Sequence, residues 1–180
     1  MVRMSAATDR RPRRVAGIYR PAVNTPRMPP PRPGPLAQLF RTANVLRAHM
    51  ERAVLRDEGM TWTTYDVLVL VCARRAVETR TAAAEIGIAK ATLTNTLVSL
   101  VDRGLVRRDL MEDDRRRVVL RPTQNGLDLA RRVQRLVEAE QARLFHGPGL
   151  PTGDNLARAL RVLATRGRQL DATDDPGASR

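Results

Sequence analysis

The segment TRTAAAEIGIAKATLTNTLVSLVDRGLVRR, residues 79–108, restricts the fold of this chain more than any other stretch. It predicts a short helix over about 81–86 that ends at Gly87, a short turn, and a second helix over about 90–103 that ends at Gly104. Glycine ends helices because it adopts left-handed backbone angles at little cost. Two helices joined by a short glycine turn are typical of the helix-turn-helix motif.

The second of these helices has two different faces. The residues predicted to be buried are Leu93, Leu97, Leu100 and Val101. The opposite face carries Thr92, Asn95, Ser99 and Asp102, with Ala91, Thr94 and Val98 alongside. For Thr94 and Ser99, plain helix surface and recognition of another molecule both remain open interpretations. Asn95 favours recognition, because asparagine has modest helix propensity and no evident local use here.

A β-hairpin is predicted directly after the two helices. The strand-like runs LVRRDL and RRVVLRPT are separated by the charged tip at 111–115. A hairpin appended to a helix-turn-helix is a winged helix. The predicted fold class is therefore mostly α: a winged helix-turn-helix with flanking helices and a small β-hairpin wing.

Further helices are predicted on both sides of this unit. The first covers 36–57 and stops near Gly59, and the next begins with Thr63 as its N-cap and Asp66 at its third position. Its apolar run at 67–73 indicates a buried, central helix. Thr123 caps a long helix that ends before the glycines and prolines of 147–151, and a last helix follows.

The outer helices carry apolar stripes that a small winged helix cannot bury alone. They lie within 36–54, 127–144 and 156–170. Such stripes can close around a twofold axis with their counterparts in a second copy. The sequence therefore predicts a homodimer, with 36–57 and 124–171 as the dimerisation helices.

Basic residues dominate the charge of the chain, and many lie in its first segment. The net charge is +13, and Lys90 is the only lysine. Residues 1–35 hold eight arginines, eight prolines and one acid, and are predicted to be a disordered basic tail. This tail is a non-specific DNA-binding arm, a solvated extension, or the result of a misplaced start codon with Met28 as the true start. Residues 172–180 are predicted to be a second disordered tail.

Several classes of protein have no support in the sequence. Cys72 is the only cysteine, so a disulfide framework within the chain is excluded, and a reducing cytoplasm is expected. A buried thiol is expected there rather than a redox sensor. No apolar run reaches the roughly 20 residues of a membrane span, and no export signal follows the N-terminal arginines. Neither a metal-ligand cluster nor a catalytic motif is evident, so no enzyme activity and no cofactor are expected.

The stretches IGIAKATLTNTLVSLVDRGLVRR and EDDRRRVVLRPTQNG resemble the core of the MarR family of bacterial transcriptional regulators. The order of elements agrees over about 36–171. The matching positions are Gly87, Ile88, Lys90, Thr92, Thr94, Leu100, Gly104, Leu105, Val106, Asp114, Arg116, Thr123 and Gly126. Two departures are Ala89, where the family usually has a capping serine, and Asn95–Thr96, where an Arg-Leu pair is more usual.

The resemblance implies an obligate homodimer with one recognition helix in each of two major grooves. In many members, an effector pocket lies between the dimerisation part and the DNA-binding part. Here the DNA-binding core would be residues 61–123, so the resemblance implies a pocket between this core and the dimerisation helices. Met50, Trp62, Tyr65 and Val69 are the candidate pocket residues, although each also fits a core position. Many family members bind phenolic or lipophilic compounds.

The recognition helix carries side chains that suit DNA contacts. Asn95 can pair with an adenine through two hydrogen bonds, and Thr92 and Thr94 can contact bases or phosphates. Lys90 and Arg103 are expected to hold phosphates at the two ends of the helix. The predicted set is Lys90, Ala91, Thr92, Thr94, Asn95, Ser99 and Arg103.

The wing tip EDDRRR, residues 112–117, combines acids with arginines. Asp114 can pair with Arg116 and leave Arg115 and Arg117 to contact the DNA backbone or the minor groove. The resemblance assigns Arg116 either to the minor groove or to the supporting aspartate. The alternative is a solvated cluster of surface ion pairs.

These features predict a sequence-specific DNA-binding regulator of transcription: a cytoplasmic homodimeric repressor of a bacterial operator, modulated by a small-molecule effector, without a membrane partner. The operator is expected to be pseudo-palindromic. The alternative is an architectural protein that coats DNA with little sequence preference. A winged helix that mediates only protein contacts is a third hypothesis.

Overall fold

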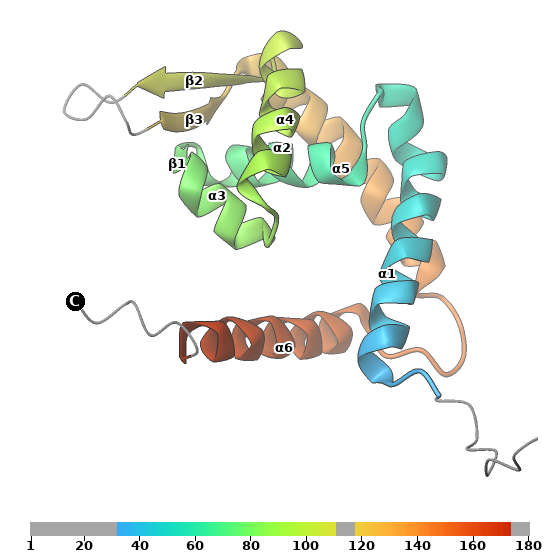
Figure 1. Cartoon of the computed structure of the whole chain (residues 1–180). Coiled ribbons are helices and arrows are strands. Elements are labelled where there is room, and N and C mark those ends of the chain that lie inside the picture. The colour runs from blue at the N-terminus through green and yellow to red at the C-terminus, as the bar shows by residue number, and fades with distance from the viewer. Residues whose placement is uncertain (1–31, 111–117, 174–180) are drawn as a thin grey trace, which may run out of the picture.

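The computed structural model describes residues 32–110 and 118–173 (Figure 1). The elements are α1 (Pro35–Met50), η1 (Glu51–Leu55), η2 (Arg56–Glu58), α2 (Trp62–Arg74), β1 (Val77–Glu78), α3 (Thr79–Ile86), α4 (Lys90–Asp102), β2 (Val106–Leu110), β3 (Val118–Pro122), α5 (Gln124–Leu144) and α6 (Gly153–Thr173). The described part of the chain is mostly helical with one small antiparallel sheet. This confirms the predicted winged-helix fold class.

The first helical segment ends where the sequence predicts, but it is not one regular helix. The α-helix α1 passes into the π-helical turn η1 and then into the 3₁₀ turn η2. Gly59 ends the segment with a left-handed φ of 61°. The N–H of Met60 donates to the carbonyl of Leu55 at 3.0 Å, and the N–H of Gly59 donates to that of Arg56 at 2.9 Å. These two bonds form a Schellman motif, which satisfies the last carbonyls of the segment.

Helix α2 begins earlier than predicted. Its N-cap is Thr61, whose Oγ1 accepts the N–H of Thr64 at 3.2 Å, and Thr63 lies inside the first turn. The prediction of Thr63 as the cap was therefore wrong. The Glu51 carboxylate accepts the N–H of Trp62 at 2.8 Å, so a residue of η1 satisfies a second free amide at this helix end.

Strand β1 was not predicted from the sequence. The sheet has the order β1-β3-β2, with both pairs antiparallel, and Val77 of β1 lies opposite Leu120 of β3. The second pair joins β2 to β3 and forms the predicted wing, with Val106 opposite Pro122. A strand of two residues is too short to show an alternating pattern in the sequence.

The core is aliphatic and centres on α2. Val67, Leu68 and Val71 of α2 are completely buried, as the apolar run at 67–73 predicts. They pack in one cluster with Leu93, Leu97 and Leu100 of α4, Leu120 of β3 and Val133 of α5. Helix α2 therefore holds the helix-turn-helix, the wing and the long helix α5 together.

The start of α5 is joined closely to the turn between α4 and β2. Thr123 caps α5 as predicted, since its Oγ1 accepts the N–H of Gly126 at 3.0 Å. The same hydroxyl donates to the carbonyl of Gly104 at 2.7 Å. A Cβ at Gly126 would lie 2.0 Å from the carbonyl oxygen of Leu105, so this helical position has no room for a side chain.

Helix α6 lies apart from the core (Figure 1). Among the described side chains of α6, Leu156 and Ala157 are partly buried and all the others are exposed. The apolar residues left open are Leu160, Val162, Leu163 and Leu170, together with Leu36, Phe40, Val45 and Leu46 of α1 and Leu136 of α5. Much of the predicted stripes within 36–54 and 156–170 lies on these surfaces. The stripe within 127–144 does not, because Leu129, Ala130, Val133 and Val137 are buried in the core of the same chain and only Leu136 is exposed.

We predict that Gly126→Ala destabilises the fold by about 2–3 kcal/mol, because the new methyl group meets a backbone oxygen that cannot rotate away. Thermal and urea unfolding measure the loss. Gly153→Ala is the matched control, since a Cβ there has no heavy atom within 4 Å, and its stability should change little. Equal stability of the two variants would contradict the predicted clash.

Candidate functional site

Helix α4 presents one face to the core and the other to solvent. Leu93, Leu97 and Leu100 are at most 1% exposed, as predicted. The exposed residues include all seven of the predicted recognition set: Lys90, Ala91, Thr92, Thr94, Asn95, Ser99 and Arg103. Exposed Val98 adds an apolar patch of the kind that can contact a thymine methyl group.

The polar groups on this face are not equally free to bind another molecule. Thr94 Oγ1 donates to the Lys90 carbonyl at 2.9 Å, so its hydrogen is already used, although its oxygen can still accept. The side chain of Asn95 has no hydrogen-bond partner among the described residues. Ala89 is the N-cap and offers no side-chain cap, as the sequence indicates. The first amides of α4 therefore keep donors that side-chain caps would otherwise occupy.

Arg103 is engaged elsewhere in the chain. Its Nη2 donates to the carbonyl of Glu58 at 2.8 Å, and its Nη1 donates to that of Gly59 at 3.2 Å. The sequence assigns Arg103 to a phosphate at the end of α4. The structure instead places its guanidinium on the turn that follows η2.

The wing strands carry a charged cluster that sequence reasoning missed. Arg107 of β2 and Arg121 of β3 are register partners, and Asp109 lies beside them. The Asp109 carboxylate is 3.0 Å from Arg121 Nε and 3.6 Å from Arg107 Nη2. The sequence did contain a signal for this cluster, because Arg107 and Asp109 alternate along one predicted strand and Arg121 lies on the strand paired with it. The predicted tip residues, Asp114, Arg115, Arg116 and Arg117, lie outside the described residues.

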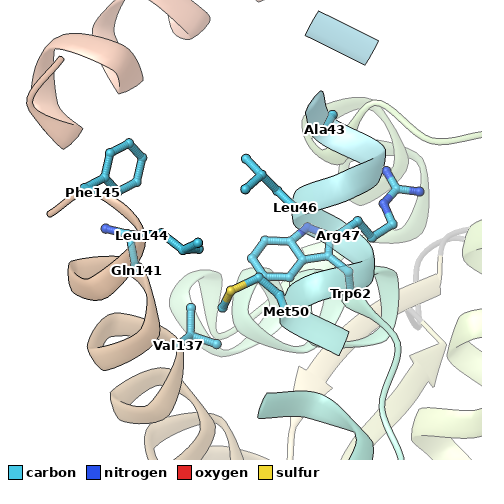
Figure 2. A pocket seen from close by; sticks show the side chains of 9 residues that line it. All are labelled: Ala43, Leu46, Arg47, Met50, Trp62, Val137, Gln141, Leu144 and Phe145. Atoms are coloured by element: carbon cyan, nitrogen blue, oxygen red, sulfur yellow. The ribbon is translucent and has the colours of Figure 1, made fainter. Parts of the chain in front are cut away.

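A cavity of about 250 Å³ opens between α1, α2 and α5. Its lining residues are Ala43, Leu46, Arg47, Met50, Trp62, Val137, Gln141, Leu144 and Phe145. Figure 2 shows Leu46, Met50 and Trp62 on one side and Val137 and Leu144 on the other, with the Arg47 guanidinium directed away from α5. Met50 and Trp62 therefore lie where the sequence expects pocket residues.

The two other predicted pocket residues do not line this cavity. Tyr65 is only 5% exposed, and its hydroxyl donates to the Oε1 of Gln134 on α5. Burial, followed by the charges of Glu138 and Asp66, raises the pKa of Tyr65 to about 12. Val69 lines a different surface hollow, beside Cys72 and Arg75. The prediction that all four residues share one pocket is corrected here, because successive turns of α2 face different neighbours.

A polar bridge joins α1 to α5 beside the cavity. His49 Nε2 lies 2.7 Å from Glu140 Oε1, and Arg143 Nη1 lies 2.8 Å from the other oxygen of the same carboxylate. The hydrogen bond with His49 is the largest cause that lowers the pKa of Glu140, and Arg143 adds to it. The gap between α1 and α5 is therefore bridged by one side-chain hydrogen bond and lined mainly by apolar side chains.

Comparisons with known proteins show which regulators this chain resembles. The sequence model of the MarR family matches residues 58–117. A curated relative, the uncharacterized HTH-type transcriptional regulator YwaE of Bacillus subtilis, is 34% identical over 88 residues. This alignment covers 49% of the chain and 52% of the relative, so the chain spans about half the length of the curated relative it matches.

A crystal structure supports the same assignment over more of the chain. A MarR-family transcriptional regulator from Rhodococcus sp. RHA1 is 27% identical, with a TM-score of 0.64 over 71% of this chain and 90% of that one. The winged-helix core of this chain is therefore similar to regulators of the MarR family. The family and the fold are those of transcriptional regulators rather than enzymes.

Another MarR-like protein, CouR of Rhodococcus jostii RHA1, was solved with p-coumaroyl-CoA. It is 26% identical, and the match covers 80% of this chain and 94% of CouR with a TM-score of 0.59. CouR, described as a transcriptional repressor, was also solved on a 23-mer DNA duplex, with 25% identity, 74% and 92% coverage and a TM-score of 0.64.

Cys72, the single cysteine of this chain, is half-buried. Burial raises the pKa of the Cys72 thiol, although the charges of Arg75 and Arg131 act in the opposite direction. Arg75 lies three residues after Cys72 in the sequence, whereas Arg131 is brought near by the fold. Among the described residues, no group of acids, histidines and cysteines could hold a metal ion, and no helix is long and apolar enough to cross a bilayer.

Proposed function

We propose that this chain is a MarR-type regulator that binds double-stranded DNA sequence-specifically as a homodimer and represses transcription. The observation that carries the proposal is the division of α4 into a buried leucine face and an exposed face of small polar side chains. The buried face holds the helix rigidly, so the exposed face is pre-organised for the edges of bases in a major groove. The net charge of +13 favours a polyanionic partner.

Six exposed residues of α4 have a role in this proposal. Asn95 reads a base, because its free amide matches the donor and acceptor that adenine shows in the major groove. Lys90, at the start of the helix, contacts a phosphate. Thr92, Thr94 and Ser99 contact bases or phosphates, and Ala91 allows close approach.

The wing supplies backbone or minor-groove contacts. We assign this role to Arg115, Arg116 and Arg117, with Asp114 as the support. Arg107 and Arg121 extend the positive surface along the described part of the wing, and Asp109 fixes the orientation of the Arg121 guanidinium. Arginine suits this position because narrow minor grooves attract it strongly.

Dimerisation follows from the apolar surfaces of α1, α5 and α6. Exposed leucines on these helices, such as Leu136, Leu160 and Leu163, need a covering surface that the described chain does not provide. A second copy supplies it through a twofold axis. The two recognition helices would then meet half-sites about 34 Å apart on one side of the duplex.

Selection of bound duplexes from a random pool, followed by affinity measurements at physiological salt, tests the proposal. A regulator binds its selected site roughly a thousandfold more tightly than random DNA. Equal binding of both would instead support an architectural role, and binding of neither would reject DNA recognition altogether.

We predict that Asn95→Ala and Lys90→Ala weaken binding in different ways. Asn95→Ala should cost about 1–3 kcal/mol on the selected site and relax the preference at one base pair. Lys90→Ala should weaken binding to all sequences and reduce the slope of log K against log salt by about 1. Electrophoretic mobility shifts across a salt series separate the two patterns. Identical effects of both variants on every sequence would contradict the assigned roles.

We predict that Leu163→Glu on α6 breaks the dimer. Each copy loses roughly 1.5–3 kcal/mol of apolar burial, and a twofold interface contains the change twice. Sedimentation at micromolar concentration should show a dimer for the wild type and a monomer for the variant. Thr165→Glu carries the same charge at another exposed position of α6 and should stay dimeric. A monomeric wild type would refute the interface.

The cavity between α1 and α5 is the proposed effector site. Its walls are mainly apolar, and its volume of about 250 Å³ suits a small aromatic or aliphatic molecule rather than a drug-sized one. CouR, with its bound p-coumaroyl-CoA, is a similar protein with a small-molecule ligand. A ligand here relieves repression only if it binds the DNA-incompetent arrangement more tightly.

Trp62 gives a direct measurement of this site, because it is the only tryptophan in the chain and lines the cavity. We predict that small aromatic compounds which bind there change Trp62 fluorescence and weaken operator binding in the same concentration range. Ala43→Phe narrows the cavity and should weaken both responses at least tenfold. Thr42→Phe, on the neighbouring exposed position, is the control. Ligand responses that survive Ala43→Phe unchanged would place the effector elsewhere.

A further inference from the structure

The turn at Glu58 and Gly59 is held by two arginines that come from distant parts of the chain. Arg103, directly after α4, donates to the backbone carbonyls of both turn residues at 2.8 and 3.2 Å. Arg132 of α5 donates to the two oxygens of the Glu58 carboxylate through Nε at 3.0 Å and Nη2 at 2.8 Å. One two-residue turn therefore connects the end of the recognition helix with α5.

The carbonyls of this turn suit a cation. The Schellman motif at Gly59 uses the carbonyls of Leu55 and Arg56, so those of Glu58 and Gly59 remain as acceptors. They also lie at the C-terminal end of a helical segment, which carries partial negative charge. A guanidinium spans two such acceptors because its donors form a rigid, planar fork, whereas a lysine ammonium has no such geometry.

Arg103 binds the backbone carbonyl of Glu58, and Arg132 binds its side-chain carboxylate. The Glu58 side chain is 22% exposed, and Arg132 meets it through two parallel hydrogen bonds. The hydrogen bond with Arg132 is the largest cause that lowers the pKa of Glu58, and the charge of Arg103 contributes to the same direction. Both arginines therefore act on one residue.

We propose that Arg103, Glu58 and Arg132 form a clamp that positions the recognition helix relative to α5, and that Arg103 is a positioning residue rather than a phosphate contact. The proposal rests on the DNA-binding function proposed above. Helix α5 belongs to the proposed dimer interface, so the clamp would set how the two recognition helices of a dimer are spaced and oriented. Specific DNA binding by a dimer depends on that spacing.

The test compares Arg103→Ala, Arg103→Lys, Glu58→Gln and Arg132→Ala with Arg135→Ala in the full chain. Arg135 is an exposed arginine of α5 without a hydrogen bond or ion pair among the described residues, so its loss controls for charge. Affinity is measured on the selected operator, on the same half-sites with one base pair added or removed, and across a salt series. Thermal melting monitors folding of each variant.

The clamp predicts about tenfold weaker operator binding for Arg103→Ala, Arg103→Lys, Glu58→Gln and Arg132→Ala, with the salt slope of Arg103→Ala unchanged. These variants should also lose discrimination against altered half-site spacing, which a mere loss of folded protein would leave intact. The double variant Arg103→Ala with Arg132→Ala should be no worse than either single one. Arg135→Ala should retain the wild-type spacing preference.

A phosphate contact gives the opposite pattern and overturns the proposal. Arg103→Ala would then reduce the salt slope by about 0.9, Arg103→Lys would preserve binding, and Glu58→Gln and Arg132→Ala would behave like Arg135→Ala. If the wild type shows no preference for any duplex, the DNA-binding function fails and the clamp with it. If the wild type selects a site and spacing preference survives in every clamp variant, only the clamp is wrong.

Discussion

The contact between the first turn of α5 and the backbone of Leu105 fixes the relative positions of the functional parts. A side chain at Gly126 would lie 2.0 Å from the Leu105 carbonyl oxygen, so the two backbones touch directly. The Thr123 side chain bonds both the Gly104 carbonyl and the Gly126 amide. The end of α4, the beginning of β2, the end of β3 and the start of α5 therefore meet at one point. The recognition helix, the wing and the long helix cannot move there independently.

Helix α4 is consequently held firmly at one end and left open at the other. At its C-terminal end, Gly104 is bonded by Thr123, and Arg103 binds the turn at Glu58 and Gly59. Its N-terminal end has no side-chain cap and is exposed over Lys90, Ala91 and Thr92. Leucines along one side seat the helix on α2. A rigid helix with a free N-terminal half is the arrangement that base recognition in a major groove requires, because binding then orders little of the protein.

Much of the fold could be predicted because its signals are local. Gly87 and Gly104 both adopt left-handed φ values, of 74° and 65°, at the predicted helix ends. The prediction failed where two residues could each have been the N-cap of α2, Thr61 and Thr63. The additional hydrogen bond that the Trp62 N–H donates to the Glu51 carboxylate favours the earlier start. Strand β1 exists only through its pairing with β3, so no pattern within two residues could indicate it.

The candidate site was predictable where a helical face defines it and unpredictable where distant segments meet. The exposed face of α4 follows from the spacing of its leucines. The partners of Arg103 lie 44 and 45 residues earlier in the chain, so its role required the tertiary structure. Likewise, the cavity is formed by residues of α1, α2 and α5, which lie far apart in the sequence. The sequence-based prediction of pocket residues therefore included Tyr65 and Val69 of α2, although Tyr65 faces the core and Val69 faces another hollow.

The open apolar surfaces and the cavity involve the same helices, which has a physical consequence for regulation. Helix α1 contributes exposed Leu36 and Phe40 to the unpaired surface, and Leu46 and Met50 to the cavity wall. Only the His49–Glu140 bridge joins α1 to α5 by a side-chain hydrogen bond among the described residues. A molecule larger than this cavity of about 250 Å³ must therefore displace apolar side chains of the two helices that, in the proposed dimer, also contact the partner. Because interiors are close-packed, such a displacement moves whole helices rather than single side chains.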